Sequence, residues 1–348
     1  MSPRATNLAL LVLLTAELVS GLAGFVVGAP SGRWVFWLHG VGGFALVLLL
    51  AWKWRIVARS FARRGAGPWA VAPAALGVCV LGALVTGLAW STVGLPPVPL
   101  PGVGRASGLT LHVLLALLSA PLLIAHALMR WPRPRRADLV GRRAALRMLG
   151  LLGGGLVAWR AVEAGARVLA FDGAGRRFTG SREAGSLGGN AHPVTNWLSD
   201  RVRRFDAASW RLAIDGAVAR PYALSYDELA TTARTAVGAI LDCTGGWYTE
   251  QRWSGVPLSV LVAAAGPSAG ARSVVVRSAT GYARRFAFDE AAGLLLATHV
   301  GGAPLSTGHG FPARLVAPDR RGFAWVKWVT AVEVSERPAW WQPPLPLQ

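Results

Sequence analysis

Long apolar runs dominate the first half of the chain. Four of them are long enough to cross a lipid bilayer as helices, which takes about 20 residues. They lie at residues 7–27, 34–52, 69–90 and 109–129. Tryptophans stand at the ends of these runs, as is typical of membrane interfaces, and none of the runs has the polar stripe of a surface helix. We therefore predict an N-terminal all-α transmembrane bundle of four helices.

The pattern changes after Ala170, where the hydrophobicity becomes that of a soluble protein. Strands are predicted at 210–215, 236–241, 273–278, 294–300, 314–317 and 326–334, and helices at 226–232 and 258–265. Helices interspersed with strands of unequal length indicate an α+β domain with mixed sheets.

Charge separates the two halves and orients the bundle. Up to Ala170 the chain holds seventeen of its 36 basic residues and three of its 17 acidic ones. Most of these cations follow the second and fourth runs, whereas the other two connections contribute only Arg33 and Arg105. Basic loops stay in the cytoplasm, so both ends of the bundle are predicted to face inward. Clustered arginines also suit nucleic acid, but each cluster directly flanks a membrane run, and we predict no nucleic-acid partner.

A twin-arginine pair, Arg142-Arg143, precedes a glycine-rich apolar run that reaches Trp159. This pattern is typical of signals that export folded proteins; a basic flank that only stops transfer is the alternative. We predict a fifth, short linking span here. Charged side chains at its outer end are expected to pair: Arg160, Glu163 and Arg167.

The expected organisation has four parts. Residues 171–189 are rich in glycine, arginine and serine, a composition that favours a flexible linker. The other parts are the four-helix bundle at 1–133, the twin-arginine segment with the fifth helix at 134–170, and the C-terminal domain at 190–348.

Three of the six histidines lie in the apolar runs, where ionisable side chains are costly and are functional candidates by default. His39 and His112 are expected at nearly the same depth on two helices, as the two axial ligands of a haem iron must be. An interhelical hydrogen bond is the alternative. His126 lies 14 residues beyond His112, about four turns of helix. The corresponding position below His39 is Lys53, which does not ligate haem, so at most one haem b is predicted.

Cys243 is the main candidate for chemistry in the C-terminal half. The chain has only two cysteines, which excludes a disulfide framework and a four-cysteine zinc site. Cys79 lies in an apolar run, whereas Cys243 ends a predicted strand and opens a Gly-Gly turn. A thiolate on such a turn can reach a bound metal; a buried free cysteine is the alternative.

Four blocks follow one another in order: Cys243-Thr244-Gly245-Gly246-Trp247, Trp253-Ser254-Gly255-Val256-Pro257-Leu258, His309-Gly310-Phe311-Pro312-Ala313-Arg314, and Gly322 with Lys327 and Trp328. In this order they resemble the molybdopterin-binding domain of the sulfite oxidase superfamily. The resemblance covers residues 190–336 and is nearest to the bacterial extracytoplasmic branch, which includes the methionine sulfoxide reductase catalytic subunit.

The resemblance implies a molybdenum–molybdopterin cofactor with Cys243 as the only protein ligand of the metal, and soft sulfur suits that metal. The residues that match pterin-binding and phosphate-binding positions are His309, Arg314, Gly322 and Lys327, and more loosely Asn196 and Trp197. Trp247 and Tyr282 are candidates for the mouth of the catalytic pocket. On residue chemistry alone, these aromatic residues fit a core equally well, and the two cations fit surface salt bridges.

Three functions stay open. The first is a membrane-anchored molybdenum oxidoreductase that reduces an S-oxide or N-oxide, with a small-molecule substrate, membrane lipid, and quinone or a redox protein as partners. The second is a sulfite-type oxidase, although Thr244-Gly245-Gly246-Trp247 stands where sulfite-oxidising relatives carry a Gly-Asn-Arg type run. The third is a receptor or scaffold without metal. A domain loaded with cofactor in the cytoplasm must be exported folded, so we expect it on the periplasmic side of the cytoplasmic membrane.

Overall fold

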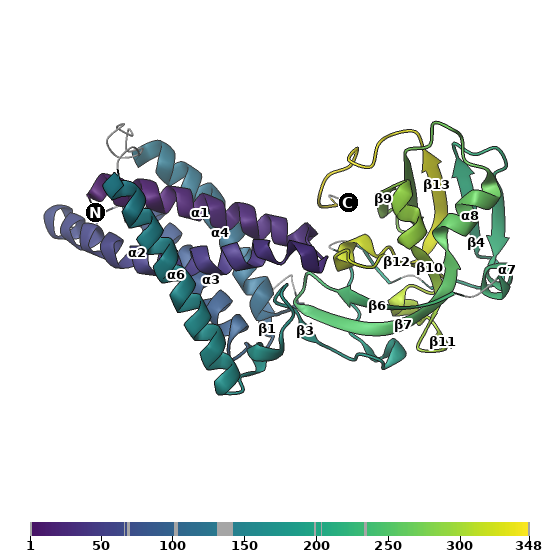
Figure 1. Ribbon diagram of the computed structural model, residues 1–348, viewed down its shortest axis with the longest axis horizontal. Coiled ribbons are helices and arrows are strands. Elements are labelled where there is room, and N and C mark those ends of the chain that lie inside the picture. Colours follow the sequence, from purple (N-terminus) through teal and green to yellow (C-terminus); the bar gives the residue numbers. More distant parts are fainter. Residues whose placement is uncertain are drawn as a thin grey trace. The chain divides into compact units, whose positions relative to one another are not determined.

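The computed structural model describes residues 2–65, 67, 70–100, 104–130, 142–197, 200–202, 204–232 and 235–346. Contacts divide the chain into two compact units, Met1–Gly180 and Ser181–Gln348 (Figure 1). The start of the third predicted run and the basic segment that precedes Arg142 lie outside the described residues.

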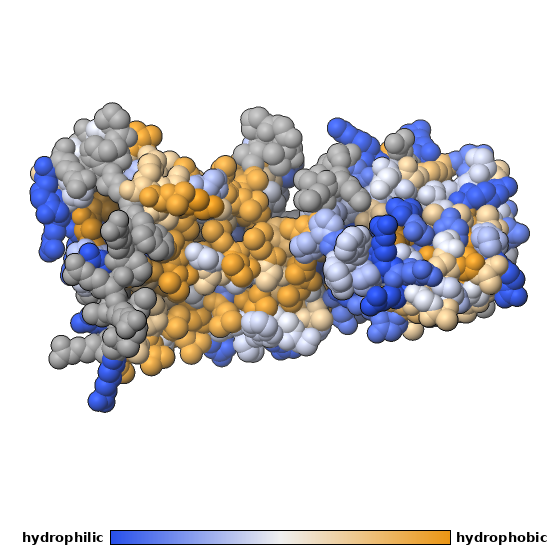
Figure 2. Space-filling model, turned by 90° about the horizontal axis from the view of Figure 1, so that it is seen from above, coloured by the Kyte–Doolittle hydropathy of each residue, from blue (hydrophilic) through white to orange (hydrophobic). Residues whose placement is uncertain are grey.

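The first unit contains five long helices: α1 (Pro3–Val26), α2 (Trp34–Arg64), α3 (Val71–Ser91), α4 (Gly108–Arg130) and α6 (Arg142–Val168). All five are long and apolar enough to cross a membrane. Large apolar side chains such as Val19, Leu81, Val85 and Leu128 are exposed on their outer faces, and Figure 2 shows an apolar surface over much of this unit. The predicted helical bundle with a fifth helix is confirmed.

Two helices are longer than predicted. Helix α2 continues to Arg64 instead of ending at Trp52, because its last turns contain good helix formers whose long cationic side chains can leave the apolar layer. Helix α6 is not short and runs to Val168. A Cβ atom at Gly155 would lie 2.5 Å from the Val41 carbonyl oxygen, so the glycines of α6 permit close packing against α2.

Charged residues in the last turns of α6 and in the segment that follows it are paired within the first unit. Glu163 lies 3.9 Å from Arg160, as expected, but its nearer partner is Arg176, at 3.2 Å. Arg176 also donates to the carbonyl oxygens of Ser91 and Gly173. The 171–189 segment, expected as a linker, therefore contains ordered contacts, including a 3-10 helix at Asp172–Gly175.

The second unit is built from two sheets. The six-stranded sheet contains β3 (Arg182–Glu183), β6 (Thr235–Asp242), β7 (Trp247–Pro257), β10 (Leu295–Val300), β11 (Ala303–Pro304) and β12 (Arg314–Val316). The five-stranded sheet contains β4 (Arg211–Gly216), β5 (Tyr222–Ser225), β8 (Ser273–Ser278), β9 (Ala283–Ala287) and β13 (Val329–Ser335). The strand pairs β3–β7 and β13–β4 are parallel and the others are antiparallel, which confirms the α+β domain with mixed sheets.

Strand β7 organises the six-stranded sheet, and the sequence patterns do not predict it. It pairs with β6 along its length and with β10 on its other side. Its inward positions include Thr249 and Gln251, which are polar although they are almost fully buried. Because these inward positions are polar like their outward neighbours, this part of β7 lacks the alternation of apolar and polar residues by which a strand is recognised in sequence.

The apolar core of the second unit lies between elements of both sheets and helix α8 (Leu258–Ala265). Leu212, Val256, Leu296 and Val332 are fully buried in it. Helix α7 (Tyr226–Thr231) begins with a capping box, in which Ser225 and Glu228 bond each other's backbone amides. This rigid frame carries the loops that form the site.

Candidate functional site

A pocket in the second unit brings together the residues that the sequence singles out there. Its lining contains all nine of the C-terminal candidates: Asn196, Trp197, Cys243, Trp247, Tyr282, His309, Arg314, Gly322 and Lys327. Cys243 directly follows β6, Trp247 begins β7 and Arg314 begins β12. The others come from the loops before β4, β9, β12 and β13. Residues that are distant in sequence thus converge on one cavity.

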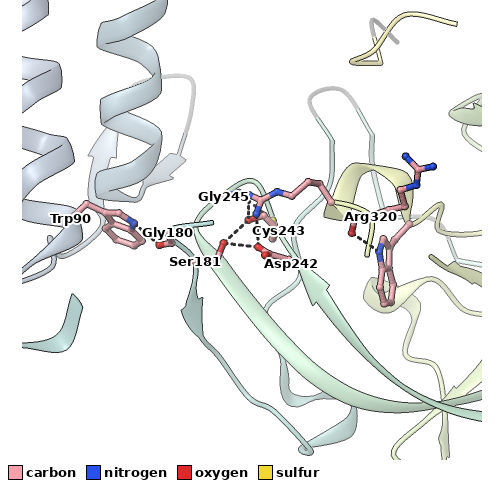
Figure 3. Close-up of polar contacts among 9 residues, drawn as sticks. Trp90, Gly180, Ser181, Asp242, Cys243, Gly245 and Arg320 are labelled. Atoms are coloured by element: carbon pink, nitrogen blue, oxygen red, sulfur yellow. Dashed lines mark hydrogen bonds and ion pairs between the residues drawn. The ribbon is translucent and has the colours of Figure 1, made fainter. Parts of the chain in front are cut away.

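The Cys243 loop rests on a buried ion pair. Asp242 accepts hydrogen bonds from Ser181 Oγ at 2.6 Å and from Arg321 Nη1 at 2.7 Å, and Figure 3 shows Ser181 and Asp242 beside the cysteine. Arg321 Nη2 also donates to the Cys243 carbonyl oxygen at 3.3 Å. Asp242 is 2% exposed and Arg321 3%, so these bonds fix the backbone that carries the thiol.

The turn itself presents the sulfur to the pocket. The Gly246 φ of +96° is a conformation that glycine adopts without strain, and it lets the Cys243 amide donate to the Trp247 carbonyl oxygen at 2.8 Å. The Gly245 amide donates to Cys243 Sγ at 3.3 Å. A Cβ at Gly322 would lie 3.1 Å from Cys243 Cα, so glycine there allows the loop before β13 to approach the cysteine.

Burial raises the pKa of the Cys243 thiol, and the Gly245 amide and the Arg321 charge act in the opposite direction. A buried thiolate is therefore unfavourable here unless a further positive group compensates it. A soft metal ion is such a group, because coordination deprotonates a thiol.

Arg314 is the clearest sign that the pocket is built for an anion. Its guanidinium lies over the rings of Trp253 and Trp325, at 5.1 and 5.8 Å, and the residue is 2% exposed. Within the described part of the chain, its Nε and Nη1 atoms have no hydrogen-bond partner. Burial lowers its pKa to about 9. A buried guanidinium whose donors face a pocket without protein acceptors is well suited to bind an anionic ligand such as a phosphate.

Lys327 adds a second cation to the pocket. Its Nζ donates to the Thr195 and Gly308 carbonyl oxygens at 3.0 and 2.7 Å and to Asn196 Oδ1 at 2.8 Å. All three acceptors are neutral, and burial, followed by the charge of Arg314, lowers the pKa of Lys327 to about 7. An anion in the pocket would stabilise both cations, so the donor set fits a pterin phosphate and the Cys243 thiol fits its metal.

His309 is held in the pocket wall by hydrogen bonds to neighbouring loops. Its Nε2 donates to the His192 carbonyl oxygen at 2.9 Å, and its Nδ1 lies 2.7 Å from Ser306 Oγ. Both nitrogens are thus engaged by protein groups. The His192 ring lies 4.0 Å from the His309 ring and faces the same cavity.

Sequence patterns do not single out His192, because it stands before a proline in an irregular loop. Its Nδ1 lies 2.8 Å from the Gly189 carbonyl oxygen, which accepts the ring proton. Among the residues described, its Nε2 has no partner. Burial lowers the pKa of His192 to about 3, so it presents a neutral acceptor nitrogen in the pocket.

Aromatic residues line the remaining wall. Trp247 Nε1 donates to Thr195 Oγ1 at 3.1 Å, and Trp197 lies 5.9 Å from the ring of Phe323. The Tyr282 hydroxyl donates to the Phe323 carbonyl oxygen, and burial raises its pKa well above the ordinary value. Tyr282 therefore contributes a ring and a fixed hydroxyl, not an ionisable group.

Comparison with known proteins identifies this unit. Residues 199–341 match the oxidoreductase molybdopterin binding domain. They form a molybdopterin-binding oxidoreductase domain. The donors of the pocket agree with this assignment, because the cysteine, the buried guanidinium and the lysine lie in that domain together.

Three relatives are similar to this chain over about two fifths of its length. YedZ1 of Azospira oryzae, named as a protein-methionine-sulfoxide reductase subunit, is 31% identical over 39% of this chain and 53% of its own length. The oxidoreductase YuiH of Bacillus subtilis is 28% identical over 39% and 72%. The protein-methionine-sulfoxide reductase catalytic subunit MsrP of Xanthomonas campestris is 27% identical over 40% and 49%. The chain thus spans about half the length of the first and third relatives.

A second candidate site lies inside the helical unit. The rings of His39 on α2 and His112 on α4 are 5.9 Å apart and nearly perpendicular, at 89°. His39 Nδ1 lies 2.9 Å from Ser20 Oγ and 3.1 Å from Glu17 Oε2. His112 Nδ1 lies 2.7 Å from the Ala83 carbonyl oxygen. Each ring therefore has a partner at Nδ1 on another helix.

The other polar residues predicted near the inner end lie apart from this pair. Lys53 donates to Asn7 Oδ1 at 3.0 Å, which joins α2 to α1. In the described ranges, no group of three or more histidine, cysteine or acidic side chains is suited to a bare metal ion. Over the part of the bundle that the structure describes, the candidate ligands are thus this pair of imidazoles.

Proposed function

We propose that this protein is a membrane-anchored molybdenum oxidoreductase that reduces an S-oxide or N-oxide outside the cytoplasm with electrons from the membrane. One observation carries the proposal. A molybdopterin-binding domain presents a cysteine thiol in the same pocket as a buried guanidinium with free donors.

The molybdenum cofactor, when bound, supplies two-electron redox chemistry coupled to oxygen-atom transfer. The residues of this chain hold and orient it. Cys243 provides the metal ligand on a loop fixed by Asp242 and Arg321, and Arg314 and Lys327 provide the donors for the anionic pterin tail. Gly322 gives room beside the cysteine.

The pocket mouth favours an organic oxide over an inorganic anion. Trp197, Trp247 and Phe323 supply aromatic surface, which makes favourable contacts with sulfur in a thioether. The names of YedZ1 and MsrP refer to methionine sulfoxide, which supports the same substrate class. The reaction consumes a sulfoxide, two electrons and two protons, and it yields a sulfide and water. A membrane quinol can supply both the electrons and the protons.

The bundle is proposed to carry one haem b between His39 and His112. These two imidazoles would hold the haem iron from two different helices, and their ring centroids lie 5.9 Å apart. Metal-binding imidazoles also donate their second N–H to a carboxylate or carbonyl, and both rings have such a partner.

The catalytic domain is proposed to lie on the periplasmic side. The basic residues in the C-terminal turns of α2 support this orientation, because cationic segments that flank membrane spans stay in the cytoplasm. The Arg142-Arg143 pair at the start of α6 supports export of a folded domain. Accessibility of cysteines placed in the second unit to an impermeant thiol reagent in intact cells tests the orientation.

Elemental and cofactor analysis tests the main proposal. Protein purified from cells that synthesise molybdopterin should contain one molybdenum per chain and reduce sulfoxides faster than it oxidises sulfite. Faster turnover with sulfite would favour the oxidase. Absence of both molybdenum and pterin would leave a receptor or scaffold.

A further inference from the structure

Glu17 is the one acidic residue in the sequence of helices α1 to α4. Its side chain is 15% exposed in a helix long and apolar enough to span a membrane. An acidic group at such a position is expensive and is retained for function or for a specific partner. The partner here is His39, whose Nδ1 lies 3.1 Å from Glu17 Oε2.

The groups around His39 Nδ1 suit a ring that carries its proton on that nitrogen. Ser20 Oγ donates its own proton to the Glu17 carbonyl oxygen at 3.1 Å, so it accepts from His39 Nδ1 at 2.9 Å. The carboxylate of Glu17 is also an acceptor. In the tautomer that donates from Nδ1 to these acceptors, His39 has its lone pair at Nε2, the nitrogen that an iron would take.

Helix α2 is shaped to admit the carboxylate. A Cβ atom at Gly42 would lie 2.0 Å from Glu17 Oε1, so any larger residue at that position displaces the acid. Gly42 is three residues from His39, on the same helix. The acid on α1 and the gap on α2 thus form one arrangement around the imidazole.

The two histidines are consequently unequal. His112 Nδ1 donates to a neutral acceptor, the Ala83 carbonyl oxygen, whereas His39 donates to a carboxylate and a hydroxyl. A hydrogen bond to a carboxylate makes an imidazole a stronger electron donor to a metal. Stronger donation stabilises ferric over ferrous iron.

We propose that Glu17 is a positioning residue that orients His39 as an axial haem ligand and lowers the midpoint potential of that haem. This inference rests on the haem site described under the proposed function. A lower potential makes the reduced haem a stronger donor toward the catalytic domain.

The test compares the full-length protein with three variants. Glu17→Gln keeps a hydrogen-bond acceptor but removes the ionisable carboxyl group, and Gly42→Ala leaves the acid in the sequence but displaces it. Ser119→Ala is the matched control, because it removes a buried hydroxyl of α4 that bonds only within its own helix, to the Ala116 carbonyl oxygen at 2.7 Å. Haem content, redox titration at one pH and the electron paramagnetic resonance of the ferric state are measured for each.

At a given applied potential, Glu17→Gln should raise the ferrous-to-ferric ratio at least tenfold, which is about 59 mV for a one-electron couple. Gly42→Ala should shift it in the same direction, and Ser119→Ala should not shift it. The ferric resonance should move in the first two variants only. Should Glu17→Gln fail to retain haem, the Gly42→Ala titration decides.

Two results overturn the inference and are distinguishable. Variants that retain haem with ratios within twofold of the parent protein show that Glu17 has only a structural role, and the haem site stands. A parent protein without b-type absorption removes the haem site itself, and the role of Glu17 with it.

Discussion

The pocket of the second unit and the histidine pair of the bundle differ in whether the donor atoms of their side chains have acceptors within the protein. In the pocket, donors are left over: Arg314 Nε and Nη1 have no acceptor among the described residues. In the bundle, the donors are used, because Nδ1 of both His39 and His112 faces an acceptor. Buried donors without protein acceptors suit an anion, whereas imidazoles that donate from Nδ1 have an Nε2 lone pair that suits a metal. Unused hydrogen-bonding capacity thus indicates which chemical group each site takes.

The largest expected effect separates the two sites. Cys243→Ser removes the proposed metal ligand and should abolish sulfoxide reduction, while the b-type spectrum of the bundle is retained. Cys79→Ser, the matched control in helix α3, should keep its turnover within about twofold. Full activity of the Cys243→Ser protein would contradict the assigned ligand.

Next in size is the effect of breaking the ion pair under the Cys243 loop. Asp242→Ala leaves the 3% exposed Arg321 side chain without its carboxylate, and removing one partner of a buried pair costs about 3–5 kcal/mol. Denaturant unfolding of the purified protein measures the loss. Glu333→Ala, which removes the partly exposed pair with Arg277, should cost about 1 kcal/mol or less. Equal losses of unfolding free energy in the two variants would show that the buried ion pair stabilises the protein no more than the partly exposed one.

A smaller effect is expected when the anion donors are altered. Arg314→Lys keeps the charge but loses the planar fork, and hydrogen bonds to charged groups contribute about 1.5–3 kcal/mol each. Retention of molybdopterin should therefore fall roughly 10- to 100-fold. Arg272→Lys, at an exposed position, is the control. Unchanged pterin content in Arg314→Lys would mean that the guanidinium does not hold the cofactor.

The sequence predicts those parts of the molecule that carry long apolar runs or several motifs in a fixed order. Long apolar runs predict four of the five helices, and the twin-arginine pattern with its glycine-rich run predicts the fifth. The ordered blocks around Cys243, Arg314 and Lys327 predict residues that share one pocket. The contribution of Asp242 and Arg321 is not predictable in this way. They are 79 residues apart, and each looks like an ordinary surface charge until the fold buries both.

The bundle shows the same limit on a smaller scale. The positions of His39 and His112 along their helices predict that they lie at the same depth in the membrane. In the structure their rings lie close together. The position of a residue along its helix does not show which face of α1 packs against α2. The contact between Glu17 and His39 is therefore not predicted from the sequence. Such lateral contacts depend on helix packing, which small residues like Gly42 determine.

The smallest expected effect concerns His126, and it tests whether position or residue type makes a haem ligand. His126 lies on α4 with His112, but the residue at the corresponding depth on α2 is Lys53, which is bonded to Asn7. An amine cannot complete a bis-imidazole site, so His126→Leu should leave the b-type spectrum and the haem content unchanged within about 10%. His112→Leu should remove both. Loss of half of the haem in the His126→Leu protein would instead show a second haem at the inner end, and the proposed single-haem bundle would be wrong.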